Sequence, residues 1–126
     1  MVELKIRKEA LQSALEASRN AYPSEFIGLF RGKKEGAETI AEELILAPLA
    51  TYERNWSAYS DWNVPLNMGI VASFHSHPNS VPKPSRQDLH FFARTAPYHF
   101  IAASPYGERN ARAYDRKGKP VEFALV

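Results

Sequence analysis

Two histidines and one aspartate in this chain have the residue types and the spacing of a metal site. His75 and His77 are separated by one residue, and Asp88 follows the second histidine by eleven. Two imidazoles and a carboxylate can hold one divalent ion, and three protein ligands leave a fourth position open for water. The pattern therefore predicts a catalytic zinc site rather than a closed structural one.

Each of these residues also has an ordinary structural explanation. A His-x-His pair on a strand can occur by chance and contribute only to the core or to the surface. Ser85 and Asp88 match the capping-box pattern, in which a serine and an acidic residue three positions later close the first turn of a helix. These separate explanations do not account for the spacing between the histidine pair and the capping box, so we favour the metal site.

A strand, a loop and a helix must follow one another to position these residues. Residues 69–77 alternate between the two faces of a predicted strand, so both histidines project to the same side, about 6.6 Å apart along the backbone. Pro82 and Pro84 predict an irregular loop over residues 79–84. A helix is predicted over residues 85–96. Its expected inner face consists of Leu89, Phe92, Ala93 and Ala96.

The remaining elements predict a mixed α/β domain. Residues 7–21 have the apolar periodicity of an amphipathic helix, which Pro23 ends. The expected inner face of that helix comprises Leu11, Ala14, Leu15, Ser18 and Tyr22. Strands are predicted over residues 25–31, 39–47, 98–103, 109–115 and 120–125, with hairpin turns at residues 32–36 and 117–118. This order of elements predicts a mostly antiparallel sheet flanked by helices.

Composition narrows the classes of protein to which the chain can belong. With 126 residues, 44% of them hydrophobic, it is most simply one domain covering residues 1–126. It has no cysteine, which excludes disulfides, thiolate metal ligands and a cysteine nucleophile. A net charge of +2 favours a solvated surface over a nucleic-acid footprint. No apolar run suits a membrane span, and residues 1–8 lack a signal-peptide core, so we expect a cytoplasmic protein.

The motif around the two histidines resembles that of a known enzyme family. His-Ser-His-Pro at residues 75–78, followed by Ser85 and Asp88, is similar to the signature of the JAMM/MPN+ zinc metalloproteases. The segment Glu-Phe-Ile-Gly-Leu-Phe at residues 25–30 resembles the second hallmark of that family, a glutamate at the start of a strand. The likeness covers essentially the whole chain and is greatest to small archaeal members, the desampylase-type isopeptidases. It implies an α+β domain with a cytidine-deaminase-like layered fold.

The resemblance also implies a role for each residue of the motif. The implied ligands of one Zn²⁺ per chain are His75, His77 and Asp88. Glu25 would be the general base, which takes a proton from the attacking water and passes it to the leaving amine. Ser85 would donate a hydrogen bond to the tetrahedral oxyanion. For the two remaining histidines, His90 and His99, we expect structural roles.

The implied substrates are ubiquitin-like modifier proteins and their conjugates. Members of the family hydrolyse isopeptide or peptide bonds after the Gly-Gly tail of such proteins. A narrow groove that binds an extended tail by strand addition would suit this activity. An aromatic stretch with Trp56, Tyr59 and Trp62 is our candidate for one wall of the groove. The same rings would serve equally well in the core or as a contact in a homodimer.

Several alternatives to this reading stay open. The domain could instead trim sulfur-carrier proteins, which share the ubiquitin fold and the Gly-Gly end. RadC-like proteins carry a similar pattern but usually add a helical DNA-associated region, which we do not find here. A non-catalytic MPN scaffold is a third possibility, against which the complete set of motif residues counts. A nucleic-acid binder is supported only by the mild basicity.

Overall fold

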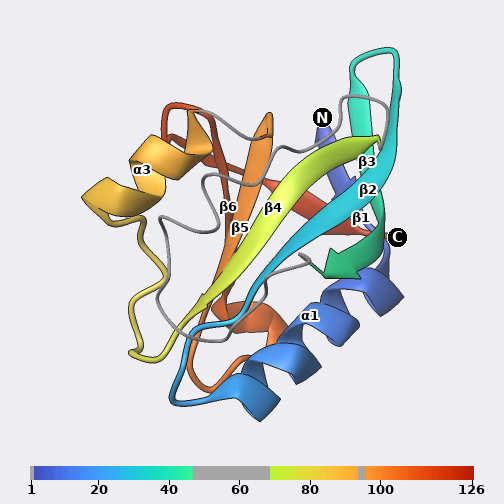
Figure 1. The fold of residues 1–126 in the computed structure, drawn as a ribbon. Helices are drawn as coiled ribbons and strands as arrows, with labels where there is room; N and C mark the ends of the chain where they lie inside the picture. The colour runs from blue at the N-terminus through green and yellow to red at the C-terminus, as the bar shows by residue number, and fades with distance from the viewer. Residues whose placement is uncertain (1, 47–68, 94–95) are drawn as a thin grey trace.

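The computed structural model describes residues 2–46, 69–93 and 96–126, with only the backbone described at residues 91 and 92 (Figure 1). The helices are α1 (Lys8–Ala21), α3 (Arg86–Phe92) and the short 3₁₀ helix η2 (Glu108–Asn110). The strands are β1 (Leu4–Ile6), β2 (Ile27–Glu35), β3 (Glu38–Leu46), β4 (Ile70–His77), β5 (Tyr98–Ala103), β6 (Ala111–Asp115), β7 (Pro120–Val121) and β8 (Phe123–Leu125). Within the described residues, no helix combines the length and the apolar character needed to cross a membrane.

The described strands form one mixed sheet in the order β7-β6-β5-β4-β2-β3-β1-β8. The pairs β1–β3, β1–β8 and β4–β5 are parallel, and the other four are antiparallel. The predicted α+β class with a mostly antiparallel sheet is therefore confirmed. β7 and β8 lie at opposite ends of this order, yet only Glu122 separates them in sequence. Because one residue spans only about 3.5 Å, the sheet must curl until its two edges approach each other.

The predicted N-terminal helix is present as α1, and it packs its apolar face against the sheet. Leu11, Ala14, Leu15 and Ser18 are fully buried, as the periodicity predicted. The prediction for Tyr22 was wrong, because its side chain is 54% exposed. The helix ends at Ala21, so Tyr22 leaves the helical spacing and instead contacts the ring of Tyr106 edge-on.

The two faces of β4 have different roles. Ala72 and Phe74 point into the hydrophobic core that β4 shares with α1. Ser73, His75 and His77 occupy the alternate positions and point to the other face, where α3 lies. One strand therefore contributes to the core through one face and to the candidate site through the other.

Strand β2 continues further than the sequence predicts. A hairpin turn was expected to begin at Gly32, but the strand runs on to Glu35 and the chain turns at Gly36. The β2–β3 register shifts between Arg31 and Gly32, so this glycine lies at a β-bulge. A Cβ atom at Gly32 would lie 1.8 Å from the carbonyl oxygen of Ile40, which only glycine avoids. The glycine therefore permits a close approach of two strands rather than a turn.

The two terminal strands were also predicted incorrectly. β1 is absent from the predicted elements, because a three-residue strand has too little sequence for a periodic pattern. Residues 120–125 were expected to form a single hairpin partner for β6. Only β7 pairs with β6, whereas β8 pairs with β1 in parallel. The last residues thus join the two edges of the curled sheet.

The predicted helix after the proline-containing loop is shorter than expected, and its buried face is different. α3 ends at Phe92, whose side chain lies outside the described part of the structure. Leu89 is 38% exposed, Ala93 is exposed, and Ala96 is buried only after the helix has ended. Asp88 is 2% exposed. The predicted inner face was therefore wrong at Leu89 and Ala93, because this turn of the helix directs Asp88 toward His75 and His77 instead.

Candidate metal centre

His75 and His77 lie at the end of β4, and their side chains project to the side of the sheet that faces α3. His75 is fully buried and His77 is 8% exposed. Their ring centroids are 5.1 Å apart. The alternation of a strand and its extended rise bring the two imidazoles to one side, where they can converge on a single point.

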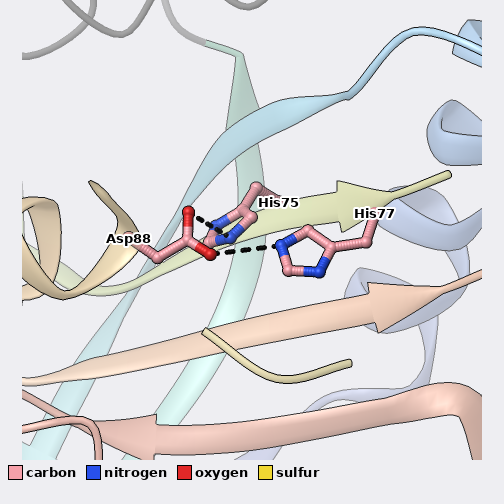
Figure 2. Close-up of side chains that lie close together, drawn as sticks. All are labelled: His75, His77 and Asp88. Atoms are coloured by element: carbon pink, nitrogen blue, oxygen red, sulfur yellow. Dashed lines mark hydrogen bonds and ion pairs between the residues drawn. The ribbon is translucent and has the colours of Figure 1, made fainter. Parts of the chain in front are cut away.

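Asp88 approaches the two histidines from the first turn of α3 (Figure 2). Its Oδ1 atom lies 3.1 Å from Nε2 of His75, and its Oδ2 atom lies 3.2 Å from Nε2 of His77. One potential ligand atom from each residue lies within 4.8 Å of the other two. The structure therefore brings together three buried groups that could hold one metal ion.

Burial, hydrogen bonds and charge together shift the pKa values of Asp88 and His77. Burial alone would raise the pKa of the Asp88 carboxyl, but hydrogen bonds from His75 and His77 outweigh burial and lower it. Burial likewise disfavours the charged form of His77. The hydrogen bond to Asp88, the carbonyl of Val81 and the charges of Asp88 and Glu25 outweigh that effect, so the pKa of His77 is raised. Without a metal, the site thus favours an ionised Asp88 beside a protonated His77, whereas a bound metal would need the same carboxylate and a neutral imidazole.

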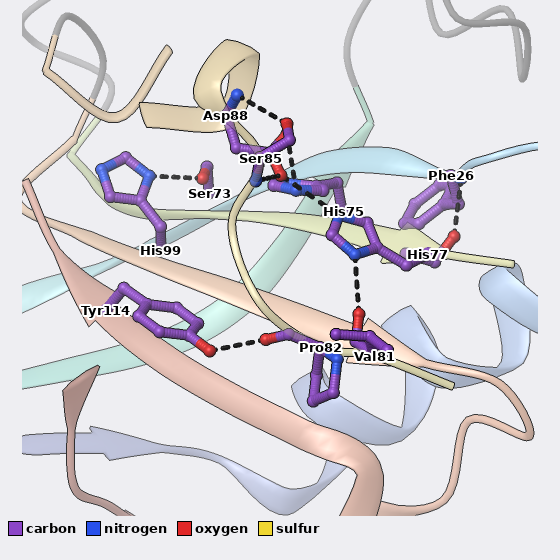
Figure 3. Close-up of polar contacts among 11 residues, drawn as sticks. Phe26, Ser73, His75, His77, Val81, Pro82, Ser85, Asp88, His99 and Tyr114 are labelled. Atoms are coloured by element: carbon purple, nitrogen blue, oxygen red, sulfur yellow. Dashed lines mark hydrogen bonds and ion pairs between the residues drawn. The ribbon is translucent and has the colours of Figure 1, made fainter. Parts of the chain in front are cut away.

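The second ring nitrogen of His77 has its own partner. Nδ1 of His77 lies 3.0 Å from the backbone oxygen of Val81, which can accept its proton and leave Nε2 free of hydrogen (Figure 3). The loop that carries Val81 is held in turn by Tyr114 on β6, whose hydroxyl donates to the carbonyl of Pro82 at 2.5 Å. Sequence reasoning missed both contacts, because a backbone acceptor leaves no signature in the local pattern.

Ser85 lies immediately before α3 and is exposed. Its backbone N–H donates to Oδ2 of Asp88 at 2.8 Å, and its hydroxyl oxygen accepts the N–H of Asp88 at 3.1 Å. These two bonds form the capping box that the sequence pattern indicated. The cap uses the hydroxyl as an acceptor, so the hydroxyl proton can still be donated elsewhere.

Glu25 lies just before β2 and is 6% exposed. Ile27 pairs with His75 in the antiparallel register of β2 and β4, and continuing that register places Glu25 opposite His77. Residues directly opposite each other in such a pair have side chains on the same face. The negative charge of Glu25 also contributes to the raised pKa of His77. The carboxyl group of Glu25 therefore lies near the metal centre.

The other two histidines, His90 and His99, are not part of this cluster. His90 is exposed on α3. His99 is fully buried on β5, and its Nδ1 atom lies 2.6 Å from the hydroxyl oxygen of Ser73 on the neighbouring strand (Figure 3). The three aromatic residues expected to line a groove lie outside the described residues. They are Trp56, Tyr59 and Trp62.

Comparison with known proteins identifies the family. Residues 7–117 match the family of prokaryotic homologs of the JAB domain. The chain is 33% identical over 120 residues to a protein of Haloferax volcanii described as a probable metalloprotease, over 90% of this chain and 74% of the relative. The chain therefore belongs to the JAMM/MPN+ family of zinc metalloproteases, as its motif indicated.

Solved structures of the same fold agree with this assignment. A JAB1/MPN domain protein from Archaeoglobus fulgidus is 35% identical, with a TM-score of 0.76, over 97% of this chain and 98% of that one. A structure described as JAMM, a metalloprotease-like zinc site in the proteasome and signalosome, is 32% identical, with a TM-score of 0.73. That match covers 100% of this chain and 99% of the other. The fold predicted from the resemblance is thereby confirmed.

Proposed function

We propose that this chain is a zinc-dependent isopeptidase that cleaves after the C-terminal Gly-Gly of ubiquitin-like modifiers. The observation that carries the proposal is the convergence of His75, His77 and Asp88 beside the buried carboxyl of Glu25. The Haloferax relative, described as a probable metalloprotease, supports proteolytic chemistry. The choice of ubiquitin-like substrates rests on the resemblance of the whole motif to that of the family.

The three candidate ligands suit zinc. An ion bonded tetrahedrally at about 2.0–2.1 Å separates its ligand atoms by about 3.3 Å. Oδ1 of Asp88 lies 3.1 Å from Nε2 of His75 and Oδ2 lies 3.2 Å from Nε2 of His77, each close to that separation, and one ligand atom from each of the three residues lies within 4.8 Å of the others. Two imidazoles and one carboxylate are also a donor set that zinc prefers in open catalytic sites. Bound zinc would supply Lewis acidity, which activates water and polarises a carbonyl near neutral pH.

Glu25 and Ser85 would move protons and stabilise charge around this centre. As general base, Glu25 would accept a proton from the attacking water and give it to the departing amine, a contribution of roughly 10²- to 10⁴-fold. The Ser85 hydroxyl would donate its remaining proton to the oxyanion of the tetrahedral intermediate. The exposure of Ser85 at the start of α3 suits this role, because a substrate carbonyl can reach it from solvent.

The proposal is tested by cleavage of a ubiquitin-fold protein joined through Gly-Gly to a lysine side chain. The wild-type protein should release the modifier with zinc and stop when a chelator removes it. Glu25→Ala should retain zinc and lose turnover, whereas Glu16→Ala, at an exposed glutamate of α1, should behave as wild type. Loss of zinc from Glu25→Ala would instead make Glu25 a metal ligand.

Other results would assign a different function. Bound zinc without isopeptide cleavage, but with trimming of a sulfur-carrier protein of the ubiquitin fold, would move the substrate to that class. Bound zinc without either reaction would favour a non-catalytic MPN scaffold. An active His77→Ala variant would end the zinc proposal altogether.

A further inference from the structure

Ser76 lies between the two histidine ligands in sequence but does not share their face of β4. Its side chain is fully buried, and its hydroxyl oxygen accepts the backbone N–H of Phe26 at 2.8 Å. The backbone N–H of Ser76 donates to the carbonyl oxygen of Phe26 at 2.9 Å. Two hydrogen bonds therefore join this residue of the metal-binding strand to the residue that follows Glu25.

This double contact changes the usual pairing of two antiparallel strands. In a regular hydrogen-bonded pair, each residue both donates to and accepts from the backbone of the other. Here the side-chain oxygen of Ser76 takes the place of its backbone carbonyl as acceptor. The ladder between β2 and β4 is thereby extended one residue beyond Ile27, which brings Glu25 opposite His77.

Tyr106 contacts the backbone of the residue that follows Ser76. Its side chain is 2% exposed, and its hydroxyl donates to the carbonyl oxygen of His77 at 3.1 Å. Burial and the charge of Tyr22 raise the pKa of Tyr106, while a hydrogen bond with Ser76 opposes that rise. Tyr106 has φ +66°, a strained value for a residue other than glycine, so the surrounding contacts hold it in place.

Two hydrogen bonds thus hold this end of β4. The N–H of Phe26 donates to the hydroxyl oxygen of Ser76, and the hydroxyl of Tyr106 donates to the carbonyl oxygen of His77. Both hydrogen bonds are buried. If either were lost, a buried polar group would have no water molecule to replace its partner. The network ties the backbone beside the proposed base to the backbone of a metal ligand.

We propose that Ser76 is a positioning residue that sets the place of Glu25 relative to the metal ligands, acting through the backbone of Phe26 and supported by Tyr106. This inference rests on the proposed function only for the role of Glu25. A hydroxyl between the two histidines is thus part of the site's construction, although it touches neither metal nor substrate. Its removal should disturb the geometry of proton transfer and leave the metal ligands in place.

The experiment compares Ser76→Ala with Ser18→Ala. Ser18 is an equally buried serine whose hydroxyl donates to the carbonyl of Ala14 within α1, so the control removes one buried hydroxyl from another part of the fold. Ser76→Ala should lower kcat by about 10- to 100-fold, with KM and zinc content unchanged, because a small misplacement of a catalytic group has effects of that size. Ser18→Ala should keep kcat. A kcat for Ser76→Ala within twofold of wild type would overturn the proposal.

A second measurement does not depend on activity. Hydrogen exchange of the Phe26 amide should be faster in Ser76→Ala than in wild type or Ser18→Ala, because the acceptor of that amide is lost. If the wild type cleaves no isopeptide, the proposed function fails, and the exchange rate alone decides whether Ser76 holds this backbone. Unchanged protection of Phe26 would overturn the inference. If Ser76→Ala does not fold, Tyr106→Phe removes one hydroxyl from the same network and should give the same loss of kcat in smaller measure.

Discussion

Ser85 and Asp88 cap helix α3 reciprocally, and the same carboxylate oxygen of Asp88 faces a candidate metal ligand. Oδ2 of Asp88 accepts the N–H of Ser85 at 2.8 Å and lies 3.2 Å from Nε2 of His77. The same atom, Oδ2 of Asp88, therefore belongs both to the cap of α3 and to the candidate metal centre. The two explanations available from the sequence, a helix cap and a metal ligand, describe the same group and do not compete.

Ser85→Ala should separate the capping role of this hydroxyl from its proposed catalytic role. Loss of the cap should lower the free energy of unfolding by about 1 kcal/mol. Loss of an oxyanion donor should lower kcat by about 10²- to 10³-fold. Zinc content should stay near wild type, because the backbone N–H of Ser85 still orients Asp88. Ser80→Ala, at an exposed serine of the preceding loop, is the control. A loss of stability with unchanged kcat would leave Ser85 as a cap alone.

Asp88→Asn should remove the metal while it preserves most of the helix start. An asparagine keeps an oxygen that can accept the Ser85 amide but loses the charge that favours a divalent ion. Zinc affinity should fall by more than about 100-fold, since loss of a partner outside the coordination sphere already costs 10- to 100-fold. Competition with a chromophoric chelator measures the affinity. His90→Ala, on the exposed side of α3, should bind zinc as wild type does. Equal affinities for the two variants would contradict the assigned ligand set.

Removal of zinc should change the pH dependence of stability. In the metal-free protein, the pKa of Asp88 is lowered from its usual value of 3.8. Its carboxylate therefore stabilises the fold at pH values above 3.8, and this contribution is lost as the pH falls through the lowered pKa. The pKa of His77 is raised from its usual value of 6.5. The protonated imidazole therefore stabilises the fold at pH values below 6.5, and this contribution is lost as the pH rises through the raised pKa. The pair therefore stabilises the chelated protein most between pH 3.8 and pH 6.5.

Bound zinc should restore the stability that the metal-free protein loses when His77 is deprotonated at higher pH. The ion binds the neutral imidazole, so protons compete with it at low pH and no longer do so once His77 has titrated. The difference in Tm between the zinc-bound and the zinc-free protein should therefore grow from about pH 5.5 to about pH 8. Differential scanning calorimetry at several pH values measures this difference. A constant difference across the range would contradict coordination through His77.

Tyr114→Phe should weaken the metal centre from a distance. The hydroxyl of Tyr114 holds the carbonyl of Pro82, and the neighbouring carbonyl of Val81 orients His77 through Nδ1. Release of this loop should raise the zinc dissociation constant by about 10-fold, the lower end of the effect of partners outside the coordination sphere. Tyr98→Phe removes a hydroxyl from β5 in the lining of a separate cavity and should leave zinc binding unchanged. If both variants bind zinc equally well, Tyr114 does not support His77.

Local patterns were sufficient where one stretch of chain decides its own structure. The three- and four-residue periodicity predicted α1, and the apolar run of residues 98–103 predicted β5 with the bounds observed. Such elements are short-range, because their hydrogen bonds or their buried faces follow directly from the order of residues. The same logic missed β1 and gave β8 the wrong partner, because these three-residue strands depend on distant pairing: β1 pairs with β3 and β8.

The sequence by itself determined the family, the candidate ligand types and the alternation that puts His75 and His77 on one face of β4. Only the tertiary structure decided that Asp88 on α3 is buried and that the chain beside Glu25 is held by Ser76. The physical reason is that these relationships depend on how separate elements pack. A buried carboxylate, or a side chain that accepts a hydrogen bond from a distant backbone amide, depends on contacts between residues far apart in sequence. Local periodicity does not predict such contacts.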